Sequence, residues 1–173
     1  MQKILLVIDM QKDFIDGALG TKEAIEIVPA VKEKIEGFDG KVIFTRDTHF
    51  ENYLDTQEGR KLPVEHCIKG TEGWEICSEL RPLCTEEPID KLTFGSSELG
   101  PMLVALNDEE PIESVTLVGL CTDICVISNA MIVKAFLPEV PVIVDAGCCA
   151  GVSPESHENA LSAMAVCQIE IER

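Results

Sequence analysis

The chain has 173 residues, 46% of them hydrophobic, and its 31 acidic against 14 basic side chains give a formal net charge of −17. This length and composition predict one domain over residues 1–173 with a packed core, and they exclude a disordered chain. The negative charge repels phosphate, so we expect no nucleic-acid partner and no membrane partner. Because no secretory signal pattern and no apolar run of about 18 residues occur, a cytoplasmic location with reduced cysteines is expected.

Five short apolar runs predict strands that are covered on both faces. A continuous run of Val, Ile and Leu is typical of a parallel sheet, in which neither face meets water. A sixth run, residues 87–91, is weaker and more polar. In chain order the predicted strands are residues 3–8, 41–45, 87–91, 114–119, 140–144 and 167–171.

Helical patterns alternate with these strands. Val28, Val31, Ile35 and Phe38 recur at helical spacing, and Pro29 is expected near the start of that helix. Further helices are expected over residues 99–106, 124–136 and 154–164, the last of them capped by Ser153. The alternation predicts an α/β three-layer sandwich with helices on both faces of a mostly parallel, doubly wound, six-stranded sheet of order 3-2-1-4-5-6.

One segment, residues 47–80, departs from this alternation. It is rich in Gly, Pro, His and Glu and has only a weak helix signal over residues 74–80, around Trp74. A long excursion from a compact sheet usually serves a site, so residues 47–80 are expected to carry substrate or metal contacts. Trp74 is expected to pack this segment onto the sheet.

Reactive side chains follow three of the predicted strands. Asp9 follows the first strand, Lys91 ends the third, and Cys125 lies just after the fourth. If Thr122 or Asp123 caps the next helix, Cys125 lies in its first turn, where the helix dipole and a nearby lysine favour the thiolate. Asp9 could then accept and return a proton. The alternative for each residue alone is structural: a buried cysteine, a turn aspartate and a surface lysine.

Several short motifs together give the chain a family resemblance. They are residues 8–14 (IDMQKDF), 45–49 (TRDTH), 66–71 (HCIKGT), 90–91 (DK) and 119–126 (GLCTDICV). With these motifs the chain resembles the isochorismatase-like cysteine hydrolases, and within them the nicotinamidases, over nearly its whole length. The resemblance implies a catalytic triad of Asp9, Lys91 and Cys125. It also implies an oxyanion hole at the N–H groups of Cys121 and Cys125, with a cis peptide bond between Leu120 and Cys121.

A metal site is expected in the excursion. Asp47 and His49 lie at i and i+2, and Glu58 and His66 follow, which supplies the mixed nitrogen and oxygen ligands that zinc or another divalent ion accepts. The resemblance implies an ion that anchors a substrate ring nitrogen. Many relatives have a third histidine where this chain has Tyr53, so Glu58 is the expected fourth ligand. The alternative is a hydrogen-bonded turn at Asp47 and His49 with a solvated Glu58.

Phe14 and Phe94 are expected to line a pocket for a flat ring, together with Leu120, although both aromatic residues could instead belong to the core. His157 is expected to be a structural hydrogen-bonding residue. No glycine-rich nucleotide or phosphate motif occurs, which disfavours nucleotide-dependent chemistry.

The resemblance implies a cysteine amidohydrolase that converts nicotinamide to nicotinate and ammonia through a thioester on Cys125. It also implies a homo-oligomer, either a dimer or a tetramer. Two alternatives stay open from the sequence: a family hydrolase of another small amide or N-carbamoyl compound, and a catalytically silent binding module.

Overall fold

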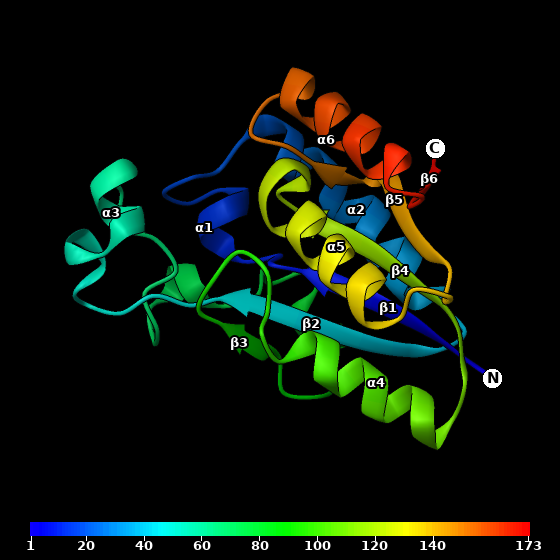
Figure 1. Cartoon of the computed structure of the whole chain (residues 1–173). Coiled ribbons are helices and arrows are strands. Elements are labelled where there is room, and N and C mark those ends of the chain that lie inside the picture. Colours follow the sequence, from blue (N-terminus) through cyan, green and yellow to red (C-terminus); the bar gives the residue numbers. More distant parts are fainter.

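Six parallel strands form one sheet in the order β3-β2-β1-β4-β5-β6 in the computed structural model, which describes residues 1–173 (Figure 1). The predicted α/β class and the predicted strand order are therefore confirmed. The strands are β1 (Gln2–Ile8), β2 (Lys41–Asp47), β3 (Ile89–Lys91), β4 (Ile112–Leu120), β5 (Val142–Ala150) and β6 (Glu170–Glu172).

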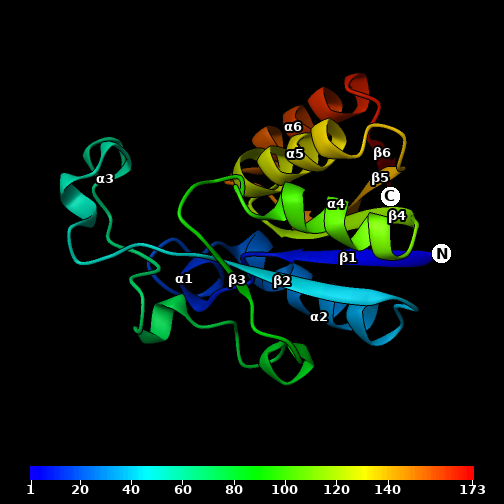
Figure 2. The ribbon, with the colours of Figure 1, turned by 60° about the horizontal axis from the view of Figure 1, so that its bottom comes forward.

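Helices cover both faces of the sheet, as Figure 2 shows. Alternate residues of β1 enter two separate cores: Ile4, Leu6 and Ile8 pack with α4, α5 and α6, whereas Leu5 and Val7 pack with α2. No helix is long and apolar enough to cross a membrane. The helices are α1 (Lys12–Ile15), α2 (Lys22–Glu36), α3 (Gln57–Lys61), α4 (Leu99–Glu109), α5 (Ile127–Phe136) and α6 (Pro154–Val166).

The start of α2 differs from the sequence expectation. The helix begins at Lys22, where the Thr21 hydroxyl accepts a hydrogen bond from the N–H of Ala24 at 3.0 Å, and Pro29 lies in its interior. Pro29 is on the exposed side of α2, so water can bond the carbonyl that a proline leaves without a partner. The predicted cap of α6 is confirmed, because Ser153 and Ser156 form a reciprocal capping box.

The last strand starts later than expected. Residues 167–171 were expected to form it, but the N–H of Cys167 still bonds to carbonyls of α6, and Gln168 has a φ of 65°. A left-handed residue reverses the chain direction, so the strand begins only after this turn, at Glu170.

The segment between β2 and β3 contains one short helix, α3, and three 3₁₀ turns: η1 (Tyr53–Asp55), η2 (Glu72–Trp74) and η3 (Arg81–Leu83). The helix expected over residues 74–80 does not form. That backbone instead pairs with the chain after β1, where the N–H of Cys77 donates to the carbonyl of Met10 at 2.9 Å. As expected, Trp74 packs this segment onto the sheet: its Nε1 donates to Thr48 Oγ1, and the Arg46 guanidinium lies 3.7 Å from its ring centre.

Candidate active site

Asp9, Lys91 and Cys125 meet at the carboxyl edge of the sheet, as hypothesised from the sequence. Asp9 follows β1, Lys91 ends β3, and Cys125 lies in a π-helical turn, η4 (Thr122–Val126), between β4 and α5. The Lys91 Nζ is 2.6 Å from Asp9 Oδ2 and 3.4 Å from Cys125 Sγ. All three residues are buried, so Lys91 is not a surface charge.

Burial dominates the electrostatics of these three groups. It raises the pKa of the Cys125 thiol well above its ordinary value, and the negative charge of Asp9 adds to this while Lys91 opposes it. Burial also raises the pKa of Asp9 more than Lys91 lowers it. For Lys91, burial works against the charge, but Asp9 and Cys125 outweigh it and raise the pKa. The directions of these pKa shifts favour an ammonium on Lys91 and a thiol on Cys125.

This result differs from the expected helix-stabilised thiolate, and the local structure explains why. Neither proposed residue caps the turn: Thr122 Oγ1 is hydrogen-bonded to His157 Nδ1 at 2.7 Å, and Asp123 Oδ1 accepts from the N–H of Val152. The turn that holds Cys125 is π-helical and precedes α5, so the sulfur lies ahead of the first regular turn. His157 has the structural hydrogen-bonding role expected for it.

The peptide bond between Leu120 and Cys121 is cis, as the resemblance implied. Cys121 and Cys125 both line the cavity described below, so the two residues assigned to the oxyanion hole lie at its wall. Their role as N–H donors stays a prediction.

Four residues of the β2 end and the excursion form a compact group of metal-ligand atoms. The donor atoms of Asp47, His49, Glu58 and His66 all lie within 4.8 Å of one another. Nε2 of His49 is 3.0 Å from Asp47 Oδ2, and Nε2 of His66 is 3.7 Å from both Asp47 Oδ2 and Glu58 Oε1. Ligands at about 2.0–2.1 Å from a tetrahedral ion are roughly 3.3 Å apart, so this donor set fits a zinc-like ion.

The surroundings hold these donors in place. His66 Nδ1 lies 2.8 Å from the carbonyl of Val64, which turns Nε2 toward the acids. Tyr53 is buried beside both histidines, with ring centres 4.7 Å from His49 and 5.1 Å from His66, and its hydroxyl donates to the carbonyl of Leu62 at 2.8 Å. Tyr53 thus packs against the group, and Glu58 supplies the fourth donor.

Asp47 joins the two groups of side chains. Its Oδ2 faces the histidines, whereas its Oδ1 is 3.2 Å from Lys91 Nζ. Burial alone would raise the pKa of Asp47, but hydrogen bonds from His49 and His66 and the charge of Lys91 lower it well below the ordinary value. Gln11 fixes the backbone of Asp47, accepting from its N–H at 2.7 Å and donating to its carbonyl at 2.9 Å.

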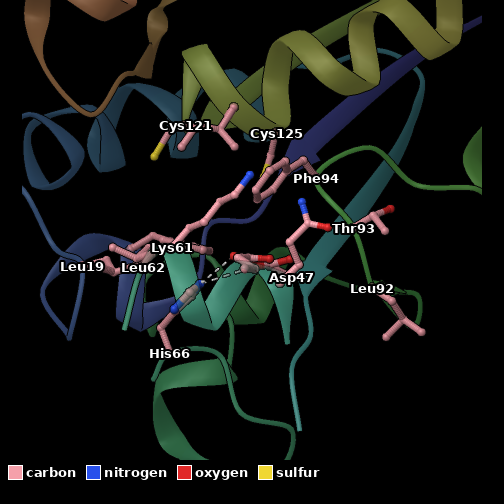
Figure 3. A pocket seen from close by; sticks show the side chains of 14 residues that line it. Leu19, Asp47, Lys61, Leu62, His66, Leu92, Thr93, Phe94, Cys121 and Cys125 are labelled. Carbon is pink, nitrogen blue, oxygen red and sulfur yellow. Dashed lines mark ion pairs between the residues drawn. The ribbon is translucent and has the colours of Figure 1, made fainter. Parts of the chain in front are cut away.

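A cavity of about 400 Å³ lies between the thiol and the metal-ligand group. Figure 3 shows Cys121 and Cys125 at one end and His66 at the other, with Asp47 beside the space between them. Phe14 and Phe94 line the cavity, as expected for pocket residues, whereas Leu120 does not: its side chain is buried in the core shared with α2. Sequence reasoning missed seven other lining residues: Leu19, Gln57, Lys61, Leu62, Leu92, Thr93 and Ile124.

Asn129 is a further residue that sequence reasoning missed. It is completely buried on α5, and its Nδ2 donates to the carbonyls of Cys125 and Phe94 at 2.8 and 3.1 Å. Its Oδ1 accepts from the N–H of Ser96 at 2.9 Å. Asn129 therefore fixes the loop that carries Phe94 to the turn that carries Cys125. The one sequence signal for it is an amide side chain in a helix whose other polar residues are Ser128 and Lys134.

Cys125 lines this cavity, and the Lys91 ammonium and the Asp9 carboxylate are buried beside it. A thiol, a carboxylate and an ammonium in contact at the edge of a parallel sheet fit the class of amidohydrolases. The sequence pattern of the isochorismatase domain matches residues 3–172, and the chain belongs to this family.

Three similar proteins cover almost the whole chain. An isochorismatase family protein of Bacillus subtilis (strain 168), PncA, is 35% identical over 176 residues, spanning 94% of this chain and 93% of that protein. The crystal structure of a pyrazinamidase of Pyrococcus horikoshii in complex with zinc has a TM-score of 0.82 and 29% identity, covering 100% and 99% of the two chains. An N-carbamoylsarcosine amidase from Thermoplasma acidophilum has a TM-score of 0.80 and 28% identity, covering 100% and 96%.

Proposed function

We propose that this protein is a nicotinamidase-type amidase that hydrolyses nicotinamide to nicotinate and ammonia through a thioester on Cys125. The observation that carries the proposal is the arrangement of two chemistries on one cavity: the Asp9, Lys91 and Cys125 group at one end and the four-donor group at the other. A cavity of this size with apolar and aromatic walls suits a small flat ring. Similarity to a pyrazinamidase, by its name an enzyme that acts on a heteroaromatic amide, supports the same substrate class.

In the first half of the reaction, Cys125 Sγ attacks the amide carbonyl carbon and its proton passes to Asp9. Lys91 holds Asp9 in place, and its charge stabilises the sulfur anion that develops. The N–H groups of Cys121 and Cys125 bind the carbonyl oxygen as it gains charge. The C–N bond then breaks, Asp9 returns the proton to the nitrogen, and ammonia leaves.

In the second half, a water molecule attacks the thioester carbonyl and gives a proton to Asp9. The carbon–sulfur bond breaks, the acid leaves, and the sulfur recovers a proton. In the proposed cycle Asp9 takes the thiol proton once substrate is bound, and the raised pKa of Cys125 favours a thiol before that step.

Asp47, His49, Glu58 and His66 would hold a divalent ion, for which we propose zinc, since two imidazoles and two carboxylates suit that ion. Bound there, the ion would supply a Lewis-acidic anchor for a ring nitrogen. The residues of the chain perform the proton transfers and the nucleophilic attack.

The test is ammonia release from nicotinamide by the wild-type protein, Cys125→Ala and Cys167→Ala. Cys167 is an exposed cysteine that does not line the cavity, and it serves as the matched control. We expect activity in the wild type and the control and none above background in Cys125→Ala. Mass spectrometry of protein quenched during turnover should show the acyl adduct on Cys125. Equal ammonia release by wild type and Cys125→Ala would refute the proposal.

A second candidate is an amidase for an N-carbamoyl compound, favoured by the similarity to an N-carbamoylsarcosine amidase. The same triad would serve it, so the metal-ligand group discriminates between the two substrates. If a chelator abolishes metal binding but leaves hydrolysis of an N-carbamoyl amino acid at full rate, this second candidate replaces nicotinamide.

We propose that the protein forms a homo-oligomer, which light scattering on the purified protein tests by its mass relative to the 18.9 kDa chain. A catalytically silent binding module is disfavoured because all three triad side chains are present and in contact.

A further inference from the structure

The side chain of Thr45 contacts Asp9 in two ways. Thr45 Oγ1 donates to Asp9 Oδ1 at 2.6 Å, and the same oxygen accepts from the backbone N–H of Asp9 at 3.2 Å. Both residues have no exposed surface, and they lie at the carboxyl ends of neighbouring strands, β2 and β1. A hydroxyl that bonds both the backbone and the side chain of one residue restricts the rotation of that side chain.

The restriction gives the two carboxylate oxygens of Asp9 different surroundings. Oδ1 is occupied by the Thr45 hydroxyl. Oδ2 is buried, forms an ion pair with Lys91 Nζ at 2.6 Å, and accepts no bond from a hydroxyl or a backbone N–H. A carboxylate oxygen has more than one lone pair, so Oδ2 can accept a proton beside this ion pair, whereas Oδ1 is engaged by the directed hydroxyl bond.

We propose that Thr45 is a positioning residue for catalysis: by holding Oδ1 and the backbone N–H of Asp9, it keeps Oδ2 directed at the Lys91 and Cys125 side of the site. The inference rests on the proposed hydrolase function. Thr45 does not line the cavity and therefore contributes to the rate of proton transfer and not to substrate binding.

The backbone of Asp9 makes such a clamp useful. Asp9 has a φ of 48°, in the left-handed region that few non-glycine residues adopt, so its side chain leaves the chain at an unusual angle. Lys91 alone does not fix the carboxylate, because an ammonium pairs with either oxygen as a point charge. The directed hydroxyl bond distinguishes one oxygen from the other.

The experiment compares Thr45→Val, Thr45→Ser and Thr116→Val. Valine matches the shape of threonine without the hydroxyl, and serine retains the hydroxyl. Thr116 is a buried threonine on β4 whose side chain makes no hydrogen bond, so Thr116→Val is the matched control. We expect Thr45→Val to lower kcat by about 10- to 100-fold with KM within about twofold of wild type, because misplacing a catalytic group costs on this scale. Thr45→Ser should recover kcat to within about threefold.

Thermal unfolding and the alkylation rate of Cys125 distinguish a positioning role of Thr45 from a purely structural role. Thermal unfolding identifies a purely structural role: a Thr45→Val protein that is less stable but keeps the wild-type kcat overturns the proposal, as does a Thr45→Ser protein as slow as Thr45→Val. If the wild type hydrolyses no small amide, the proposed function fails, and the rate of Cys125 alkylation by iodoacetamide, read by peptide mass spectrometry, still tests Thr45. We expect slower alkylation in Thr45→Val than in Thr116→Val, and equal rates would refute the positioning role.

Discussion

The triad reaches the cavity through Cys125, and the metal-ligand group reaches it through Asp47, Glu58 and His66, but the two groups are built differently. Asp9 and Lys91 are placed by the ends of sheet strands, and both are completely or almost completely buried. The metal-ligand group takes Asp47 from the end of β2 but takes His66 and Glu58 from the excursion, and the side chain of Glu58 is 24% exposed. Figures 1 and 2 show α3, which carries Glu58, standing out from the sheet.

The difference shows that sheet strands position Asp9 and Lys91, whereas short irregular segments position the side chains that determine ligand affinity. A parallel sheet holds its strand ends through many backbone hydrogen bonds, so Asp9 and Lys91 are held in place before any ligand binds, and the turn after β4 carries Cys125 to them. A five-residue helix such as α3 has no such support. Damage to the triad should therefore affect the whole protein, and damage to the excursion should affect ligand affinity.

The largest effect is expected for Lys91→Met. Removing this ammonium leaves the carboxylates of Asp9 and Asp47 buried without their cation, which costs about 3–5 kcal/mol in the free energy of unfolding. Chemical denaturation measures it. The control is Lys69→Met, because Lys69 is half exposed in its pair with Asp90 and should cost no more than about 1 kcal/mol. Equal losses in both variants would contradict the buried network.

His66→Ala tests the other group. Loss of one of four donors should lower bound metal, measured by elemental analysis of protein purified without chelator, and raise KM for nicotinamide by about 10- to 100-fold. The expected fall in kcat is smaller because the triad stays intact. His157→Ala, which removes the one histidine outside the group, should retain the wild-type metal content. A His66→Ala protein with full metal content would show that His66 is not a ligand.

Asn129→Leu is expected to have the third-largest effect, because Asn129 connects the loop of Phe94 to the turn of Cys125. It removes three buried hydrogen bonds that tie the Phe94 loop to the Cys125 turn, at a cost of about 1–3 kcal/mol in stability for the groups left unpaired. We expect KM for a heteroaromatic amide to rise about tenfold, since Phe94 forms one wall of the cavity. Phe94→Ala serves as the comparison, and Asn129→Leu with an unchanged KM would separate Asn129 from the wall.

The smallest signal is expected from the pH dependence of Cys125. Its folded-state pKa is raised, so the thiol stays protonated as pH rises and ionises only near the raised value. An ordinary cysteine titrates near pH 8.5. The ultraviolet thiolate absorbance of wild type minus Cys125→Ser should therefore stay flat between about pH 6 and pH 8.5. A titration step in the difference absorbance would contradict the raised pKa and would support the thiolate expected from the sequence.

The fold was largely predictable because its signals are local and redundant. Five apolar runs, a weaker sixth run and the alternation with helices predict a doubly wound parallel sheet, and the order 3-2-1-4-5-6 is a common order of such sheets. The triad was predictable because strand ends in such a sheet converge. The raised pKa of Cys125 was not predictable, because burial depends on side chains from the whole chain and outweighs the local helix field that the sequence suggests.

The cavity wall was less predictable than the triad. Leu92, Thr93 and Phe94 follow β3 in a loop whose position depends on Asn129, which lies 35 residues after Phe94, and no periodic pattern predicts that contact. Lys61 and Leu62 reach the cavity from the end of α3 and the residue after it, and the direction of α3 follows from the Tyr53 contacts and not from its own sequence. Sequence patterns predict helices and strands. The positions of the loops around the cavity depend on contacts between side chains from distant segments, which such patterns do not show.

The shared carboxylate of Asp47 has a consequence for engineering. Asp47 contacts Lys91 through Oδ1 and the histidines through Oδ2, so a substitution of Asp47 removes contacts in both groups at once. Its effect on activity will not equal the sum of the effects of a Lys91 and a His66 substitution. A redesign for a different ion should keep Asp47 and vary Glu58, a partly exposed donor that contacts no triad residue. Substitutions that change substrate range and substitutions that change reactivity can then be made separately. Substitutions of Asp47 are the exception, because Asp47 contacts both groups.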